Sequence, residues 1–306
     1  MSQGLSGKII LVSGGTGSIG SELVKQSLAL GARKVIVFSR DETKHFMLRK
    51  RFRDDRLSTV VGDVRDIRSV EKAFDTKALT FNYPASVDIL YHAAAMKHVI
   101  MCEETPFESA MTNIIGTQNV MDTAVKYGVP TAITISTDKA FMPTTAMGAT
   151  KLLAERITLN AGYSCVRFGN VANSRGSVIP VYVEDLLNGN PLYVSNPDVT
   201  RFIMRISDAV KLIIESTDKL QKEIYVLPMP AFRLGDLVDV MVNRIAPKLK
   251  VKAQIEKGVP FPNEKQHESL SDNTSSEHAV MLTKDELEVI VDEYLKERLV
   301  EGNLLR

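Results

Sequence analysis

The chain has 306 residues, of which 44% are hydrophobic and 25% are charged, an ordinary balance for a globular protein. Because 38 Lys and Arg residues almost cancel 37 Asp and Glu residues, the net charge of +1 gives no electrostatic argument for a nucleic acid or an anionic membrane as partner. Two cysteines are too few for a disulfide framework, and we find no signal-peptide or membrane-spanning pattern. We therefore expect a soluble, cytoplasmic protein that binds neither nucleic acid nor membrane.

The first thirty residues predict a strand, a glycine-rich turn and a helix. An apolar run at residues 9–13 is followed by the glycine turn, and a helical pattern covers residues 18–30, closed by Gly31. Glycines let the backbone approach a pyrophosphate, and the amino terminus of a helix offers oriented N–H groups. We predict a dinucleotide-binding loop here, with a purely structural glycine turn as the alternative. Its predicted contacts are Gly14, Thr16, Gly17, Ser18, Ile19 and Gly20.

The end of the second predicted strand, at residues 35–38, bears on the choice of cofactor. An acidic residue there would hold the ribose hydroxyls of NAD, whereas a basic residue would accommodate the phosphate of NADP. Ser39 and Arg40 favour NADP, and Asp41 keeps NAD as the alternative. The dense basic run at residues 49–53 is predicted to be a solvated helix face, or else to border a cofactor phosphate.

Further short apolar runs at residues 59–61, 87–91, 132–135 and 164–167 alternate with helical patterns at 113–126 and 149–160. Strands that alternate with helices predict an α/β fold, a Rossmann-type doubly wound parallel sheet. Residues that follow the third and fourth strands complete the predicted cofactor contacts: Asp63, Val64, Ala93, Ala94, Ala95 and Lys97. Lys97 could instead reach the substrate, or form a solvated pair with His98.

The composition changes after about residue 169, with Asn, Gly and Pro clusters at 188–191 and 196–198 and a polar patch at 263–276. We expect residues 1–168 to form the NADP-binding Rossmann domain and 169–306 to form mainly a smaller, loop-rich substrate-binding lobe, with a segment such as 207–240 returning to the first domain. An amphipathic helix is predicted at 283–299, with apolar Leu287, Ile290, Val291 and Leu295 at helical spacing. The five histidines show no ligand spacing, so no metal site is predicted.

The segment after the predicted strand 132–135 carries the strongest candidates for chemistry. It reads Ser136-Thr137-Asp138-Lys139-Ala140, and Met147-Gly148-Ala149-Thr150-Lys151 follows. An acid and an amine just past an apolar strand lie at the carboxyl edge of a sheet, where open α/β folds bind ligands. Burial and mutual proximity would tune them as acid and base. The alternative is an ordinary turn in which Asp138 and Lys139 pair on the surface.

These segments resemble the extended short-chain dehydrogenase/reductases, and within them the UDP-N-acetylglucosamine 4,6-dehydratases of the polysaccharide biosynthesis protein family. The resemblance runs from about Lys8 to His267. Members usually carry a tyrosine four residues before the lysine at 151, whereas this chain has Met147, as does a subgroup of the family. Beyond the glycine loop and the segments above, the resemblance is carried by Ala93-Ala94-Ala95-Met96-Lys97-His98-Val99, Thr112-Asn113, Gly116-Thr117, Gly169-Asn170-Val171, Ser174-Arg175-Gly176-Ser177-Val178, Thr200-Arg201-Phe202 and Asn263-Glu264-Lys265-Gln266-His267-Glu268.

The resemblance implies a nucleotide-sugar dehydratase that oxidises carbon 4, eliminates water across carbons 5 and 6 and returns the hydride to carbon 6, the first step towards deoxyamino sugars of surface glycans. It implies Asp138 as the acid to the departing hydroxyl and Lys139 as the base at carbon 5. Lys151 would hold the nicotinamide ribose, with Thr137 as a hydrogen-bond partner, and Met147 would line the sugar pocket or simply pack. Without a tyrosine the base for the first oxidation stays open, and Asp138 is one candidate.

The resemblance also implies a homo-oligomer and a set of substrate contacts: Lys97, Asn170, Ser174, Arg175, Ser177, Val178, Thr200, Arg201, Arg205 and Glu264. Guanidinium groups match phosphate oxygens, so the three arginines suit a diphosphate, with structural ion pairs as the alternative. Two other functions remain open. One is a nucleotide-sugar epimerase or reductase of the same fold, which would ordinarily have tyrosine at position 147, and the other is a non-catalytic dinucleotide sensor.

Overall fold

The computed structural model describes residues 3–75, 86–217, 222–260 and 263–300. The chain divides into two units, Met1–Arg167 with Ser207–Leu227, and Phe168–Ile206 with Pro228–Arg306. Residues 228–240, which we expected to return to the first domain, belong instead to the second unit. The reason is that Ala231–Arg233 pairs with Thr200–Arg205, and Leu237 is buried in the core of the second unit.

The first unit alternates strands with helices as the sequence predicts. Its strands are β1 (Ile9–Ser13), β2 (Lys34–Ser39), β3 (Leu57–Val61), β4 (Ile89–His92), β5 (Thr131–Thr137), β6 (Ser164–Phe168) and β10 (Ile224–Val226). Its helical segments are η1 (Gln3–Leu5), α1 (Ser18–Ala29), α2 (Glu42–Phe52), α3 (Ile67–Phe74), α4 (Val99–Glu104), α5 (Pro106–Ala110), η2 (Met111–Ile115), α6 (Gly116–Lys126), η3 (Asp138–Ala140), α7 (Ala146–Asn160) and α9 (Ile206–Ser216).

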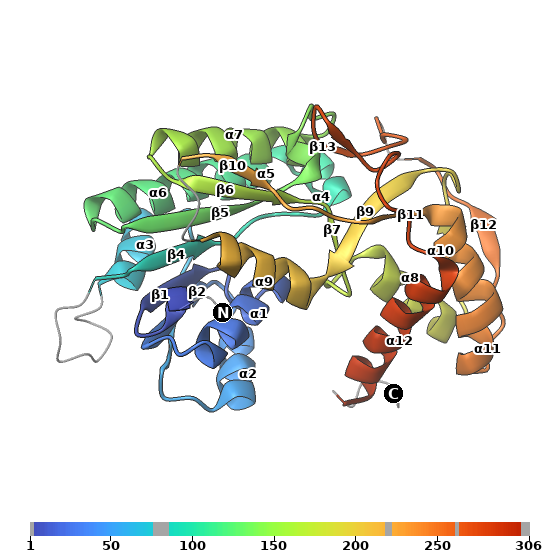
Figure 1. Cartoon of the computed structure of the whole chain (residues 1–306), viewed down its shortest axis with the longest axis horizontal. Helices are drawn as coiled ribbons and strands as arrows, with labels where there is room; N and C mark the ends of the chain where they lie inside the picture. Colours follow the sequence, from blue (N-terminus) through green and yellow to red (C-terminus); the bar gives the residue numbers. More distant parts are fainter. Residues whose placement is uncertain (1–2, 76–85, 218–221, 261–262, 301–306) are drawn as a thin grey trace. The chain divides into compact units, whose positions relative to one another are not determined.

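The strands form a parallel sheet, which confirms the predicted α/β doubly wound fold. Its order in the described residues is β3-β2-β1-β4-β5-β6-β10. Strand β1 pairs in parallel with β2 on one side and with β4 on the other, so the winding direction reverses between β1 and β4. Figure 1 shows α1 and α2 on one face of this sheet and α6 and α7 on the other. Ligands of such sheets bind beyond the carboxyl ends of the strands at the reversal.

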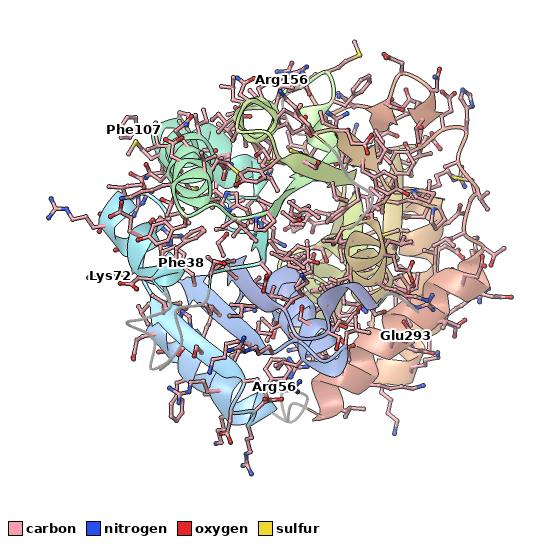
Figure 2. The ribbon with its side chains drawn as sticks, turned by 60° about the vertical axis from the view of Figure 1, so that its left-hand side comes forward. Phe38, Arg56, Lys72, Phe107, Arg156 and Glu293 are labelled. Carbon is pink, nitrogen blue, oxygen red and sulfur yellow. The ribbon has the colours of Figure 1, made fainter. Side chains whose placement is uncertain are left out.

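Burial on both faces explains why the strands appear in the sequence as continuous apolar runs. All five residues of β1 are buried, as are the first five of β2. Figure 2 shows Phe38 of β2 inside the unit, whereas Phe107 of α5 lies on its surface, in agreement with their exposures of 1% and 71%.

Two helices differ from the predicted ranges in ways that matter for the site. Helix α7 begins at Ala146 rather than at residue 149, because the Thr145 side chain accepts a hydrogen bond from the Gly148 N–H and caps the helix. Met147 therefore lies in the first helical turn. The helix predicted at 113–126 begins earlier, in the π-helical turn η2, a geometry that is frequent at functional sites.

The second unit contains small sheets and several helices, so it is more regular than the loop-rich lobe we expected. Its strands are β7 (Asn170–Ala172), β8 (Leu192–Val194), β9 (Thr200–Arg205), β11 (Ala231–Arg233), β12 (Ile255–Lys257), β13 (Ser269–Ser271) and β14 (Thr274–Ser275). Its helices are α8 (Val178–Asn188), α10 (Leu234–Val240), η4 (Met241–Ile245), α11 (Ala246–Leu249) and α12 (Lys284–Val300).

The predicted carboxy-terminal amphipathic helix is confirmed as α12. Its four predicted apolar residues, Leu287, Ile290, Val291 and Leu295, are all buried in a core shared with α8 and α10. Ion pairs to the neighbouring helices line its polar side, including Lys248 with Asp292 at 2.7 Å between Nζ and Oδ2. The helix therefore packs on its own unit.

Candidate active site

The glycine loop after β1 forms a tight turn against the segment that follows β4. Gly14 has φ +69°, and a Cβ added there would lie 2.6 Å from the Ala94 nitrogen. A Cβ at Gly20 would overlap the Gly14 carbonyl oxygen. Only glycine fits these two positions, and the close packing brings the predicted contacts at residues 14–20 and 93–95 together. Helix α1 begins at Ser18, directly after the turn, so its first N–H groups have no partner within the helix and suit a pyrophosphate.

A buried histidine links the carboxyl ends of β1 and β4. His92 Nδ1 lies 2.6 Å from Ser13 Oγ, and His92 Nε2 lies 3.0 Å from Thr117 Oγ1. Because the Thr117 hydroxyl donates its one proton to the Asn113 carbonyl at 2.6 Å, it accepts from His92 Nε2–H, and Nδ1 accepts from Ser13. Burial lowers the pKa of His92 to about 3. The imidazole is therefore a neutral structural link.

The polar groups at the end of β2 bear on cofactor choice. Thr16 Oγ1 lies 2.9 Å from Ser39 Oγ, so the glycine loop and β2 meet at two hydroxyls. Asp41 caps α2 by accepting the Lys44 N–H at 3.0 Å, and this bond, followed by the one from the Lys44 ammonium, lowers the pKa of Asp41. Arg40 is 57% exposed, with Nη1 3.7 Å from Asp63 Oδ2. The carboxylate that would favour NAD is thus engaged in helix capping.

The remaining predicted cofactor residues, Asp63, Val64 and Lys97, differ in their contacts and in their burial. Asp63 accepts hydrogen bonds from the Arg65 guanidinium, at 2.9 Å from Nε and 2.7 Å from Nη2. Val64 has a buried side chain that packs in the core. Lys97 is exposed. The basic residues at 49–53 lie exposed in and just after the last turn of α2, as a solvated helix face would.

Asp138 lies fully buried in the short turn that follows β5. Its Oδ1 accepts from Thr137 Oγ1 at 2.7 Å, from the Lys139 N–H at 2.9 Å and from Lys139 Nζ at 3.2 Å. Its Oδ2 is also buried, and within the described ranges it has no hydrogen-bond partner. The alternative of a surface pair is therefore wrong, since Asp138 has 0% exposure. A buried oxygen left unsatisfied is costly, so Oδ2 suits a proton or a ligand hydroxyl.

Helix α7 packs against this turn through Gly148. A Cβ at Gly148 would overlap the Lys139 carbonyl oxygen, so glycine is required for the close approach. Lys151, one turn further along α7, donates to the Ile135 carbonyl at 2.6 Å, and burial lowers its pKa. Met147 is buried. The structure therefore brings all five predicted catalytic residues, 137–139, 147 and 151, to one end of β5, although the Thr137 hydroxyl donates to Asp138.

Asn113 is a site residue that we did not assign from the sequence. Its Oδ1 accepts the Met96 N–H at 2.8 Å, and its Nδ2 donates to the Met96 carbonyl and to Thr150 Oγ1, both at 3.0 Å. The side chain thus ties the loop after β4 to α7 beside Lys151. The sequence signal that could have identified Asn113 is a polar residue at a position where the amphipathic pattern of the helix predicts burial.

In the second unit, the predicted phosphate-binding residues Arg201 and Arg205 form ion pairs. Arg201 Nη2 lies 2.7 Å from Glu264 Oε1, and both residues are predicted substrate contacts. Arg205 donates twice to Glu293 of α12, at 2.7 and 2.9 Å; Figure 2 labels Glu293. Arg175 is exposed. An anionic substrate would therefore meet Arg201 and Arg205 as paired guanidinium groups.

The other predicted substrate residues of this unit lie on β7, on β9 and around the start of α8. Ser177 is the N-cap of α8 and Val178 its first residue, and Ser177 Oγ is buried without a partner in the described part of the chain. Thr200 Oγ1 lies 2.8 Å from His267 Nδ1. Asn170 begins β7 and is half-buried, and Ser174 is buried.

The described residues contain neither a metal-binding cluster nor a membrane-spanning helix. No group of three or more His, Cys, Asp or Glu side chains there could hold a metal ion. No helix in those ranges is long and apolar enough to cross a membrane.

Known proteins resemble the chain over most of its length. An "Uncharacterized membrane protein" of Methanocaldococcus jannaschii is 43% identical over 81% of this chain and 74% of the relative. A UDP-glucose 4-epimerase of Rickettsia canadensis is 33% identical (80% and 73%), and the inverting UDP-N-acetylglucosamine 4,6-dehydratase of Campylobacter jejuni is 34% identical (80% and 74%). The solved structure of Pen from Bacillus thuringiensis is 31% identical, with a TM-score of 0.86 over 94% of this chain and 98% of that one.

A family model described as "Polysaccharide biosynthesis protein" matches residues 10–287, which include the glycine loop, the Asp138 turn and α7. That match covers most of the chain, and the relatives and the fold agree with it. The chain therefore belongs to the polysaccharide biosynthesis protein family, within the extended short-chain dehydrogenase/reductases.

Proposed function

We propose that the protein is a UDP-N-acetylglucosamine 4,6-dehydratase that uses NADP. The observation that carries the proposal is the buried carboxylate of Asp138, which has one saturated oxygen, one oxygen without a partner in the described residues, and Lys139 Nζ 3.2 Å from Oδ1. A dehydration needs both an acid and a base beside the sugar, and this turn offers one of each. The similarity to the Campylobacter jejuni dehydratase supports the substrate class.

The glycine loop fits a dinucleotide, since any Cβ at Gly14 or Gly20 would collide with backbone where the pyrophosphate would approach. When bound, the nicotinamide would accept a hydride from carbon 4 of the sugar and return it to carbon 6. Ser39 and the exposed Arg40 support NADP, because Asp41 is engaged in capping α2. Lys151, next to the end of β5, would hold the nicotinamide ribose.

The protein groups account for every proton of the reaction. Asp138 Oδ2 takes the proton of the carbon 4 hydroxyl as that carbon becomes a ketone, which makes the hydrogen at carbon 5 acidic. Lys139 Nζ, as the neutral amine, then removes the carbon 5 proton. Asp138 returns its proton to the carbon 6 hydroxyl, which leaves as water. Once the hydride reaches carbon 6, Lys139 reprotonates carbon 5, so both side chains end as they began.

An epimerase is the second candidate, because a UDP-glucose 4-epimerase is 33% identical to the chain. Epimerisation at carbon 4 needs oxidation and reduction at that carbon alone, and it leaves the proton at carbon 5 untouched. An epimerase of this fold would ordinarily have tyrosine at position 147 to exchange the carbon 4 hydroxyl proton, and it would need no base such as Lys139 at carbon 5. The two candidates differ in whether carbon 5 exchanges with solvent.

The test is to incubate the protein with UDP-N-acetylglucosamine and NADP in deuterated water and to follow the sugar by NMR. A dehydratase produces a new methyl signal and deuterium at carbon 5, and the coupling at carbon 5 gives inversion or retention. A carbon 4 epimer without a methyl signal would indicate an epimerase. An unchanged sugar, with cofactor binding retained, would require the same assay with other nucleotide sugars and would favour a dinucleotide sensor.

A further inference from the structure

Beneath the candidate active site lies a buried ion pair to which the proposed mechanism assigns no role. Glu155 of α7 is completely buried, and Arg167 of β6 is nearly so. Arg167 Nε donates to Glu155 Oε1 at 2.9 Å, and Arg167 Nη2 donates to Oε2 at 2.7 Å. Ser136 Oγ donates to the same Oε1 at 2.6 Å. One carboxylate thus receives three hydrogen bonds from two strands of the sheet.

These contacts hold the chain on both sides of the turn η3 (Asp138–Ala140), called the catalytic turn below because the proposed mechanism uses Asp138 and Lys139. Ser136 immediately precedes Thr137 and Asp138, and Phe141 immediately follows the turn η3. The Arg167 guanidinium carbon lies 5.6 Å from the centre of the Phe141 ring, a cation–π distance. The Phe141 N–H also donates to the Asp138 carbonyl at 3.0 Å. Glu155 therefore holds Ser136, two residues before the turn, directly, and it holds Phe141, the residue after the turn, through Arg167.

Helix geometry places the Glu155 carboxylate on the same face of α7 as Lys151, the lysine proposed to hold the nicotinamide ribose. Glu155 follows Lys151 by four residues, so the two side chains lie on one face of α7. Lys151 donates to the Ile135 carbonyl, next to Ser136. Two contacts, Lys151 with Ile135 and Glu155 with Ser136, therefore set the register of α7 against the end of β5.

Stability alone is a weak explanation for such a pair. Desolvating two charges offsets much of their attraction, and apolar residues of similar volume are often at least as stabilising. Ion pairs in protein interiors can instead specify a single arrangement of the groups around them. The pair contacts Ser136 and Phe141 on either side of the turn Asp138–Ala140, and Glu155 is on the same helix as Lys151, so a single arrangement here matters for the proposed chemistry.

We propose that Glu155 is a positioning residue that, through Ser136 and Arg167, fixes the turn Asp138–Ala140 relative to Lys151. The proposal rests on the proposed function for its kinetic consequence. Its geometric content, that the turn loses its fixed conformation when the pair is removed, does not depend on which sugar is used.

The experiment compares two perturbing variants with a matched control. The double variant Glu155→Leu with Arg167→Met replaces the pair by apolar side chains, and Ser136→Ala removes one contact while leaving the pair intact. The control, Thr134→Val with Thr158→Val, removes a hydroxyl pair 2.7 Å apart that is equally buried between β5 and α7, but further from the turn.

We expect kcat of the double variant to fall about 100-fold, the effect of misplacing catalytic groups by about 1 Å, with KM and the NADP dissociation constant changed less than about threefold. Ser136→Ala should lower kcat about tenfold, and the control should retain the wild-type kcat. The midpoint of thermal unfolding should not fall in the double variant. In hydrogen exchange, the amides of Lys139 and Phe141 should exchange faster than in the wild-type protein in both perturbing variants. In the control they should exchange at the wild-type rate.

Wild-type kcat in a folded double variant would overturn the proposal, as would a loss of kcat with unchanged exchange at Lys139 and Phe141. If the double variant does not fold, Ser136→Ala decides by the same two measurements. If the wild-type protein turns over no nucleotide sugar, the proposed function fails. The exchange measurement still tests the positioning role in that case, because it requires no substrate.

Discussion

Replacing Asp138 by asparagine separates proton transfer from hydrogen bonding at the end of β5. The amide has nearly the shape of the carboxylate, and its oxygen can still accept from the Thr137 hydroxyl and the Lys139 N–H. The nitrogen takes the place of Oδ2, the buried atom without a partner in the described residues, and it cannot carry a proton between sugar hydroxyls. The substitution therefore removes the proposed chemistry and keeps most of the local contacts.

The expected loss follows from the number of proton transfers assigned to Asp138. A positioned acid or base typically contributes about 10²- to 10⁴-fold. Asp138 serves twice, at carbon 4 and at carbon 6, so we expect kcat to fall about 10⁴-fold or more, which corresponds to about 5.5 kcal/mol in activation free energy. A buried amide N–H₂ without an acceptor costs about 1–3 kcal/mol in unfolding free energy, which a folded protein generally withstands.

The assay measures the rate at which the methyl signal appears by NMR, together with NADP binding and the midpoint of thermal unfolding. Asp122→Asn, an exposed carboxylate-to-amide change on α6, is the matched control and should retain full activity. Turnover above about a hundredth of the wild-type rate in a folded Asp138→Asn protein would refute the assignment, because the loss expected of a missing acid or base is at least about 10²-fold.

Three further predictions test other parts of the site. Lys139→Ala should abolish deuterium incorporation at carbon 5 while leaving NADP binding intact, and persistent exchange, read by NMR, would assign the base to another group. Arg40→Ala should weaken NADP binding about tenfold or more and change NAD binding less than about threefold, as expected for the loss of a charge-assisted phosphate contact; equal effects in a titration with both cofactors would contradict that role. Because the pKa of His92 is lowered from 6.5 to about 3, the folded protein binds fewer protons than the unfolded chain between those pH values. The contribution of His92 to the free energy of unfolding is therefore fully present above pH 6.5. It falls as the pH drops towards 3, by at most about 1.4 kcal/mol per pH unit. Urea unfolding at several pH values should show this slope reduced in His92→Asn, and an unchanged slope would mean that other groups cause it.

Much of the first unit could be predicted because its information is local. The strand before Gly14, the turn and the helix that begins at Ser18 agree with the structure, since apolar runs, glycines and helical periodicity act over a few residues. The adjacent Asp138 and Lys139 were also recognisable as candidates, because a polar pair directly after a buried strand lies at the sheet edge where ligands bind. The four buried residues of α12 followed from helical spacing in the same way.

Other features depend on contacts between residues that are distant in the sequence. Asn113 donates to Thr150, 37 residues away, and Arg205 pairs with Glu293, 88 residues away, so neither partner could be identified from a local pattern. The end of the segment that returns to the first unit was misplaced for the same reason, because the pairing of β11 with β9 and the burial of Leu237 assign residues 228–240 to the second unit.

The sequence by itself therefore determined the α/β architecture, the position of the glycine loop and the identity of the acidic and basic candidates, because each depends on the order of neighbouring residues. Only the tertiary structure decided which oxygen of Asp138 is saturated, that Asp41 is engaged in capping, and that Glu155 and Arg167 form a buried pair beside the turn Asp138–Ala140. Hydrogen bonding and burial are properties of the folded surroundings, since a side chain acquires its partners only when separate elements pack together.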